Sequence, residues 1–130
     1  MLRFLWLSAI AAVVVGSLLP ASSAPIRALD NLHVSDKLEH LVAYAVLAFL
    51  PCLHERTAII NRMIAGILLL GVGLEFGQLY SEGRSFEVAD MVADGCGVLL
   101  GVIFGIPLRK LFSQIFTLRQ SQTAEGSEFV

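Results

Sequence analysis

Three long apolar segments, at roughly residues 38–53, 63–80 and 88–106, each carry polar side chains near one end. These side chains belong to His40, Tyr44, Glu75, Gln78, Asp90 and Asp94. If successive segments cross a membrane in alternating directions, all six lie at a similar depth near one surface. Polar and ionisable groups inside a bilayer are costly and commonly mark a functional site. The pattern therefore predicts one shared polar site.

Helical spacing places these side chains on one face of each predicted helix, because residues three or four apart are neighbours there. The resulting stripes are Asp36–His40–Tyr44, Glu75–Gln78 and Asp90–Asp94. An acid facing lipid at a helix centre would cost about 2.5–3.5 kcal/mol, whereas one apolar residue recovers only about 0.3–0.6 kcal/mol. We therefore expect the acids to face the bundle interior, where Lys37, Arg84 or His40 can neutralise them.

Three kinds of chemistry fit these residue types. Lys37 and Arg84 could contact a lipid-linked phosphate, a peptidoglycan-precursor head group or a phospholipid head group. His40 could act as a general base with Glu75 in a membrane-embedded hydrolase or transferase. A divalent cation could also be coordinated, by His40, Glu75, Asp90 and Asp94.

The residue pattern favours a binding protein over an enzyme, because no nucleophile is evident. Ser35, Ser81 and Ser85 fit helix caps or turns. No metal signature surrounds Asp90 and Asp94, so the sequence assigns no metal ion and names no cofactor. A structural or accessory role also stays open, although interhelical polar contacts contribute only about 0.6 kcal/mol each.

Composition also indicates a membrane protein. The 130 residues are 56% hydrophobic and 15% charged, whereas a soluble domain typically has about 25% charged residues. A net charge of -2 without a basic stripe argues against a nucleic-acid partner. Cys52 and Cys96 lie in apolar segments, so we expect packing residues and no disulfide. The fold predicted is all-α, a bundle of about four transmembrane helices in the lipid bilayer, either alone or as a homo-oligomer.

The hydrophobic runs divide the chain into three parts. Residues 1–24 predict a first transmembrane helix, with a cleaved signal peptide as the alternative. Residues 35–107 hold three further helices, with Asp36 the predicted N-cap of the first and Ser85 that of the last. Residues 108–130 are predicted to form a cytoplasmic tail that is partly disordered.

Small residues are predicted to let the helices pack closely. Gly97, Gly101 and Gly105 repeat every four residues on the last helix, a spacing typical of close helix contacts in membranes. Gly73 and Gly77 are expected to serve the preceding helix in the same way.

Positive charge predicts the orientation. Of the 9 Lys and Arg residues, the larger group is expected on one side: Arg3, Arg56, Arg62, Arg109, Lys110 and Arg119. The other side carries Arg27, Lys37 and Arg84. The positive-inside rule then places both termini in the cytoplasm of a bacterial cell and the polar site near the outer surface of its inner membrane.

Two segments resemble the VanZ-like integral membrane proteins: SDKLEHLVAYAVLAFL and LEFGQLYSEGRSFEVADMVADGCGVLLG. The family pattern maps onto Asp36, Lys37, His40, Tyr44, Glu75, Gln78, Arg84, Asp90 and Gly97. Asp94 stands where that family usually has Asn. The resemblance spans roughly residues 35–101. It implies a small bundle of transmembrane helices, and an association with low-level resistance to the glycopeptide teicoplanin.

Overall fold

The computed structural model describes the backbone of residues 1–31 and 35–127, and the side chains of residues 1–28 and 35–115. Within these ranges the chain forms helices and no strand. The helices are α1 (Leu2–Leu18), α2 (Ala24–Asn31), α3 (Asp36–His54), α4 (Thr57–Gln78) and α5 (Val88–Ser127). The predicted all-α fold is confirmed for the described part of the chain.

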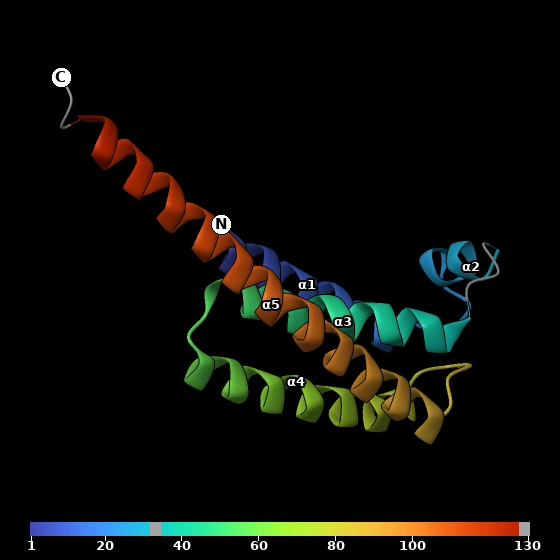
Figure 1. Cartoon of the computed structure of the whole chain (residues 1–130). Coiled ribbons are helices and arrows are strands. Elements are labelled where there is room, and N and C mark those ends of the chain that lie inside the picture. The colour runs from blue at the N-terminus through green and yellow to red at the C-terminus, as the bar shows by residue number, and fades with distance from the viewer. Residues whose placement is uncertain (32–34, 128–130) are drawn as a thin grey trace.

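The four long helices run up and down, so that the chain reverses at two opposite ends of the molecule (Figure 1). α3 and α5 form the closest pair, α1 packs against α3, and α4 contacts the other three. We call one end the turn end, where residues 55–56 join α3 to α4 and α1 begins. The other is the loop end, where α2 and residues 79–87 lie.

Two of these helices are long and apolar enough to cross a membrane: α4, with 22 residues, and the Val88–Ile115 part of α5, with 28. A spanning helix needs about 20 predominantly apolar residues. α1 is apolar but has only 17 residues. α3 has 19 residues and carries Asp36 and Glu39 in its first turn. Length and composition alone therefore give two candidate spans.

Three glycines explain why α3 and α5 approach so closely. A Cβ atom at Gly97 would meet the carbonyl oxygen of Leu41, and one at Gly101 would meet that of Ala45. Gly105 continues the same contact one turn further on, against the last part of α3. Since backbone atoms fill these positions, α3 can lie against α5 only where α5 has no side chain.

The prediction that Gly73 packs against another helix is wrong, because nothing lies within 4 Å of a Cβ placed there. Two residues turn an α-helix by about 200°, so Gly71 faces inward while Gly73 faces outward. A Cβ at Gly77 would lie 2.9 Å from Cδ2 of Leu18. Gly77 thus borders α1.

Neither predicted N-cap residue caps its helix. Ser35, not Asp36, caps α3, because its Oγ accepts a hydrogen bond from the Leu38 amide at 3.3 Å. Asp36 is the first residue of the helix, where the helix dipole stabilises a negative charge. α5 begins at Val88, so Ser85 lies too far upstream to cap it.

The prediction that the last helix ends at Pro107 is wrong, because α5 continues to Ser127. Proline removes a single backbone donor, whose partner would have been the carbonyl of Ile103, and the helix can continue beyond it. The following segment contains Leu, Arg, Lys and Gln, which are good helix formers. Residues 128–130 of the predicted tail lie outside the described residues.

Pro51 creates a similar gap inside α3, and α1 fills it. Proline lacks the N–H that would otherwise bond the carbonyl of Leu47, four residues earlier. The indole Nε1 of Trp6 donates a hydrogen bond of 2.9 Å to that same carbonyl oxygen. A single side chain therefore satisfies the carbonyl that Pro51 leaves without a donor, and it fixes α1 beside α3.

Glu55 joins three helices at the turn end. Its carboxylate accepts hydrogen bonds from Nε of Arg3 at 2.6 Å and from Nη2 at 3.2 Å. Its backbone carbonyl accepts a hydrogen bond from Arg109 of α5. The hydrogen-bonded Arg3 guanidinium holds the pKa of Glu55 below its ordinary value. Glu55 is therefore a carboxylate at neutral pH.

Candidate functional site

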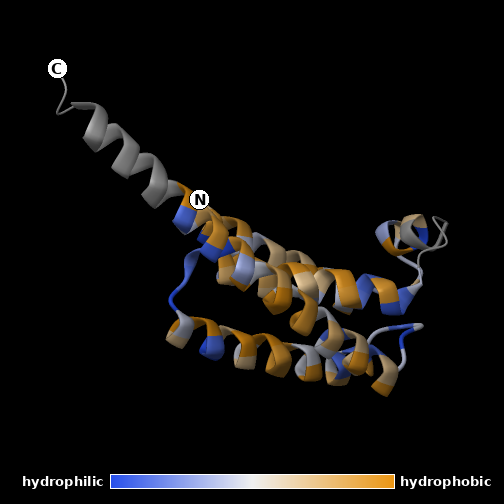
Figure 2. Cartoon of the chain, in the orientation of Figure 1, coloured by the Kyte–Doolittle hydropathy of each residue, from blue (hydrophilic) through white to orange (hydrophobic). Residues whose placement is uncertain are grey.

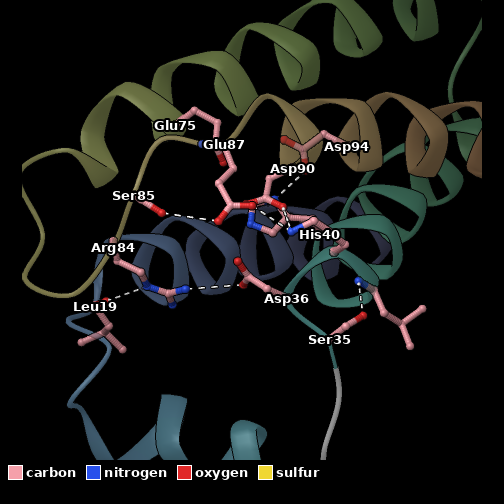
Figure 3. Close-up of polar contacts among 12 residues, drawn as sticks. Leu19, Ser35, Asp36, His40, Glu75, Arg84, Ser85, Glu87, Asp90 and Asp94 are labelled. Atoms are coloured by element: carbon pink, nitrogen blue, oxygen red, sulfur yellow. Dashed lines mark hydrogen bonds and ion pairs between the residues drawn. The ribbon is translucent and has the colours of Figure 1, made fainter.

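The loop end brings together the polar residues that the sequence places inside apolar segments. All six are buried, on three helices: His40 and Tyr44 on α3, Glu75 and Gln78 on α4, and Asp90 and Asp94 on α5. Asp36 and Lys37 are exposed and Arg84 is half-buried at the same end. Figure 3 shows Asp36, His40 and Asp90 close together at this end. We call these nine residues the polar cluster.

The most buried contact in the polar cluster joins His40 to Asp94. His40 Nδ1 lies 2.8 Å from Asp94 Oδ1, and the two side chains are 9% and 4% exposed. When the imidazole is neutral and its Nδ1–H donates to Asp94, Nε2 keeps its lone pair. The carboxylate thereby fixes both the tautomer and the orientation of the imidazole ring.

Both cations of the polar cluster have acidic neighbours. Lys37 Nζ donates to Glu87 Oε2 at 2.8 Å and lies 3.5 Å from Asp90 Oδ1. Arg84 Nη1 lies 3.5 Å from Asp36 Oδ1. The bond from Lys37 lowers the pKa of Glu87, which precedes α5 in the loop. The Arg84 contact is at the limit of hydrogen-bond length, so this guanidinium is only weakly held.

Carboxylates outnumber permanent cations in this region. The acids are Asp36, Glu75, Glu87, Asp90 and Asp94, and the cations are Lys37 and Arg84. Burying an acid without a partner is expensive, so such groups are normally paired or coordinate a metal ion. The charge balance favours a cation over a bare anion as the first ligand of this site.

Several buried carboxylate oxygens lack a hydrogen-bond partner within the described part of the chain. They are Glu75 Oε1, Asp90 Oδ1 and Asp94 Oδ2. The second oxygen of Glu75 accepts a 3.2 Å hydrogen bond from the amide of Glu87, so α4 also holds the loop before α5. Three acceptors without donors indicate that the protein side chains alone do not satisfy the cluster.

A cavity of about 230 Å³ lies beside the polar cluster. Part of its lining is apolar and comes from α1 and α2, and part is polar and comes from the cluster. The apolar residues include Ala12, Val13, Gly16 and Ile26, and the polar ones include Asp36, His40, Gln78 and Arg84. A molecule with an apolar part and a polar head matches such a lining.

Three further residues lie in this region, although the sequence did not predict them as site residues: Gly71, Glu87 and Ser17. A Cβ at Gly71 would lie 2.7 Å from Asp94 Oδ2 and 3.1 Å from the Tyr44 hydroxyl, so this glycine makes room for the cluster. Glu87 pairs with Lys37, and Ser17 lines the cavity. Gly71 could have been selected as an inward-facing small residue four positions before Glu75.

The candidate catalytic pair has a different geometry from the one expected. His40 pairs with Asp94, while Glu75 bonds the loop amide of Glu87. Ser35 caps α3, and Ser81 donates to the carbonyl of Leu18 at 2.8 Å. These serine hydroxyls are used in structural bonds. The arrangement offers an oriented imidazole beside a cavity.

A second group of ligand atoms emerges from the same geometry. Asp36, His40 and Asp90 each offer one metal-ligating atom, and these atoms lie within 4.8 Å of one another. Asp36 is absent from the set of cation ligands that the sequence suggests, which consists of His40 and the acids of α4 and α5. The helical stripe of α3 places Asp36 one turn before His40, on the same face.

The fold and its polar cluster define a class: an all-α protein with two candidate membrane spans and buried ionisable groups at one end. The sequence profile of the family described as VanZ/LLP1 matches residues 5–111. The chain belongs to this family, which confirms the resemblance found in its motifs. No curated protein and no solved structure matches the chain.

Proposed function

We propose that this VanZ/LLP1 protein is a multi-pass protein of a bacterial inner membrane that binds an amphiphilic component of the cell envelope. The ligand's polar head would contact the polar cluster, and its apolar part would lie against α1. The observation that carries the proposal is the cavity with both apolar and polar lining beside buried charged groups.

The outer surface of the helices supports membrane insertion. Large apolar side chains point outward on both candidate spans, with Leu69 of α4 73% exposed and Phe104 of α5 64% exposed. α1 has no buried residue. Figure 2 shows hydrophobic residues along the helices and hydrophilic ones gathered near the two ends. Exposed apolar surface of this extent normally contacts lipid or another protein.

The distribution of charge supports an orientation with the turn end in the cytoplasm. Arg3, Arg56 and Arg109 lie at the turn end, where Glu55 accepts hydrogen bonds from Arg3 and Arg109. At the loop end the cations are Arg27, Lys37 and Arg84, and the last two face acids. The positive-inside rule then assigns the turn end to the cytoplasm and the polar cluster to the outer half of the bilayer.

Phosphate is the head-group chemistry we favour, and Arg84 is its proposed direct contact. Arg84 lines the cavity, and its two contacts, to Asp36 and to the carbonyl of Leu19, are both 3.5 Å long. A guanidinium held this loosely can turn toward a phosphate and form two parallel hydrogen bonds. A polyprenyl phosphate and an anionic phospholipid share this chemistry.

Direct binding tests this proposal. The purified protein in detergent is titrated with a fluorescent polyprenyl phosphate and, separately, with fluorescent phosphatidylglycerol. We expect saturable binding of one lipid, weakened about tenfold or more in Arg84→Gln, because a charge-assisted contact is lost. Arg62→Gln is the matched control, since Arg62 is an exposed arginine nearer the turn end of α4. Absence of saturable binding to both lipids would overturn the proposal.

A second candidate function is a membrane-embedded hydrolase or transferase, favoured by the His40–Asp94 pair. A histidine oriented by a buried carboxylate is the usual form of a general base. Release of product from a bound lipid, lost in His40→Ala, would favour this reading. A role in teicoplanin resistance is tested separately, by glycopeptide susceptibility of a host with and without the gene.

A further inference from the structure

We propose that Asp36, His40 and Asp90 form a binding site for a divalent transition-metal ion, of the zinc or manganese type. The inference rests on the proposed function, because the ion would occupy the head-group end of the same cavity. The three ligand atoms lie within 4.8 Å of one another. Two ligands at about 2.1 Å from a shared ion are at most about 4.2 Å apart, so side-chain movements below 1 Å suffice.

The imidazole keeps one ring nitrogen available for a metal ion. Nδ1 of His40 is engaged with Asp94 Oδ1 at 2.8 Å, which leaves Nε2 for the ion. Histidines that bind metals almost always donate their other N–H to a carboxylate or carbonyl, which fixes the ring and strengthens the ligand. Asp94 therefore has the role of a positioning residue, through His40.

Asp90 supplies the independent sign that a ligand belongs here. Its side chain is 2% exposed, yet Oδ1 has no hydrogen-bond partner. The nearest cation, Lys37 Nζ, is 3.5 Å away, beyond a good hydrogen bond. Lys37 is 51% exposed and has a shorter bond of 2.8 Å to Glu87, so it can stay with Glu87 when an ion binds Asp90. A buried carboxylate oxygen without a donor is satisfied by a metal ion.

The donor set selects the kind of ion. One imidazole nitrogen with two carboxylate oxygens suits zinc or manganese, whereas calcium and magnesium prefer oxygen ligands alone. Three protein ligands leave coordination positions open, as in sites that accept a substrate. Asp36 and His40 also line the cavity, so an open position would be available to a phosphate oxygen. The ion would then explain how an acid-rich site binds an anionic head group.

Metal binding is measured without any lipid. The full-length protein is purified in detergent, stripped with a chelator, and titrated with Zn²⁺ alone by calorimetry and with Mn²⁺ alone by electron paramagnetic resonance. We expect saturation at one ion per chain. Asp36→Asn and Asp90→Asn should lose more affinity than Asp94→Asn, for which a loss of roughly 10–100-fold is expected. Glu82→Gln is the control, because Glu82 is an exposed acid of the same loop end.

The outcomes separate this inference from the proposed function. Asp36 is exposed, so its variant should fold normally and should distinguish lost ligation from misfolding. Unchanged affinity in both Asp36→Asn and Asp90→Asn, or no saturable binding by the wild type, would overturn the metal site. Saturable lipid binding by the chelator-stripped protein that metal does not strengthen would overturn the ion's contact with the head group, while leaving the lipid proposal intact. Metal binding with no lipid binding would support the site and overturn only the lipid proposal.

Discussion

Trp6 shows how one side chain compensates for a proline in a neighbouring helix. In Trp6→Phe the carbonyl of Leu47 would lose its donor, since Pro51 has no N–H to replace it. We expect a loss of about 1 kcal/mol in the free energy of unfolding, because the ring volume is largely kept while a buried acceptor is left unpaired. Thermal unfolding in detergent measures this loss.

A double variant tests the assigned cause of that loss. The substitution Pro51→Ala restores a backbone N–H at position 51, which can bond the Leu47 carbonyl within α3. Trp6→Phe should then cost clearly less than it does in the wild type. Equal costs in the two backgrounds would contradict the link between Trp6 and the proline.

Glu55 predicts a dependence of stability on pH at the turn end. Its pKa is lowered, chiefly by the hydrogen bond from Arg3, so the folded state favours the ionised form. The stability from this group is complete above the ordinary value of 4.5 and is lost as pH falls through the lower folded value. Glu55→Gln should therefore lower the melting temperature at pH 7 and converge with the wild type in acid, once the pH lies below the lowered pKa of the folded state.

The control for this experiment is Glu82→Gln, which removes an exposed acid of the loop that follows α4. It should leave the melting temperature unchanged at both pH values. A Glu55→Gln deficit of the same size at both pH values would show that the side chain acts by packing rather than by its charge.

At the scale of residues, the sequence predicted which polar side chains gather at the loop end, but not which acid pairs with His40. Polar groups in apolar runs are conspicuous, and helical spacing places them on inward faces. Which acid meets His40 depends on how α3 and α5 are registered, and that register is a tertiary property. The contact of Glu87 with Lys37 was not predicted, because an acid just before a helix is already explained by the helix dipole.

Contact between α3 and α5 depends on the small residues of α5. In Gly101→Ala the added methyl group would meet the carbonyl of Ala45 and lie 2.8 Å from the Phe49 amide nitrogen. Since backbone atoms cannot rotate away, the helices must separate, and overpacking of this kind costs about 1–3 kcal/mol. A lower melting temperature in detergent checks the expectation.

Gly95→Ala is the matched control on the same helix, because nothing lies within 4 Å of a Cβ at that position. Its effect should be neutral or stabilising by up to about 1 kcal/mol, from the better helix propensity of alanine. If Gly95→Ala destabilised the protein as much as Gly101→Ala, the close approach of α3 and α5 would not be the cause.

At the scale of elements, long apolar runs predicted α1, α3, α4 and α5, because hydrophobic length is a strong signal. The end of α5 could not be read in this way. Pro107 is a frequent helix terminator, yet one lost hydrogen bond does not end a helix whose flanking residues favour it. α2 has only eight residues. A helix this short does not repeat its apolar positions often enough for the helical period to be identified from the sequence.

At the scale of the whole molecule, the two ends carry opposite kinds of charge. The turn end is basic and holds Glu55 by Arg3 and Arg109. The loop end gathers acids around His40, next to a cavity that α1 and α2 help to line. Between the two ends the helices carry mainly hydrophobic residues. This division matches a protein whose binding chemistry lies at one membrane surface and whose basic groups hold its orientation at the other.

The proposed orientation is decided by two single cysteine reporters at the two ends of α4. In a background with Cys52→Ala and Cys96→Ala, which removes both free cysteines, reporters are placed by Arg56→Cys and Glu82→Cys. Arg56 precedes α4 and Glu82 follows it in the loop, so opposite accessibility means that α4 spans the membrane. A membrane-impermeant maleimide should label Glu82→Cys in intact spheroplasts, but Arg56→Cys only after permeabilisation, because basic residues favour the cytoplasm. Reversed labelling would place the polar cluster at the cytoplasmic surface, and labelling of both reporters in intact spheroplasts would exclude a spanning α4.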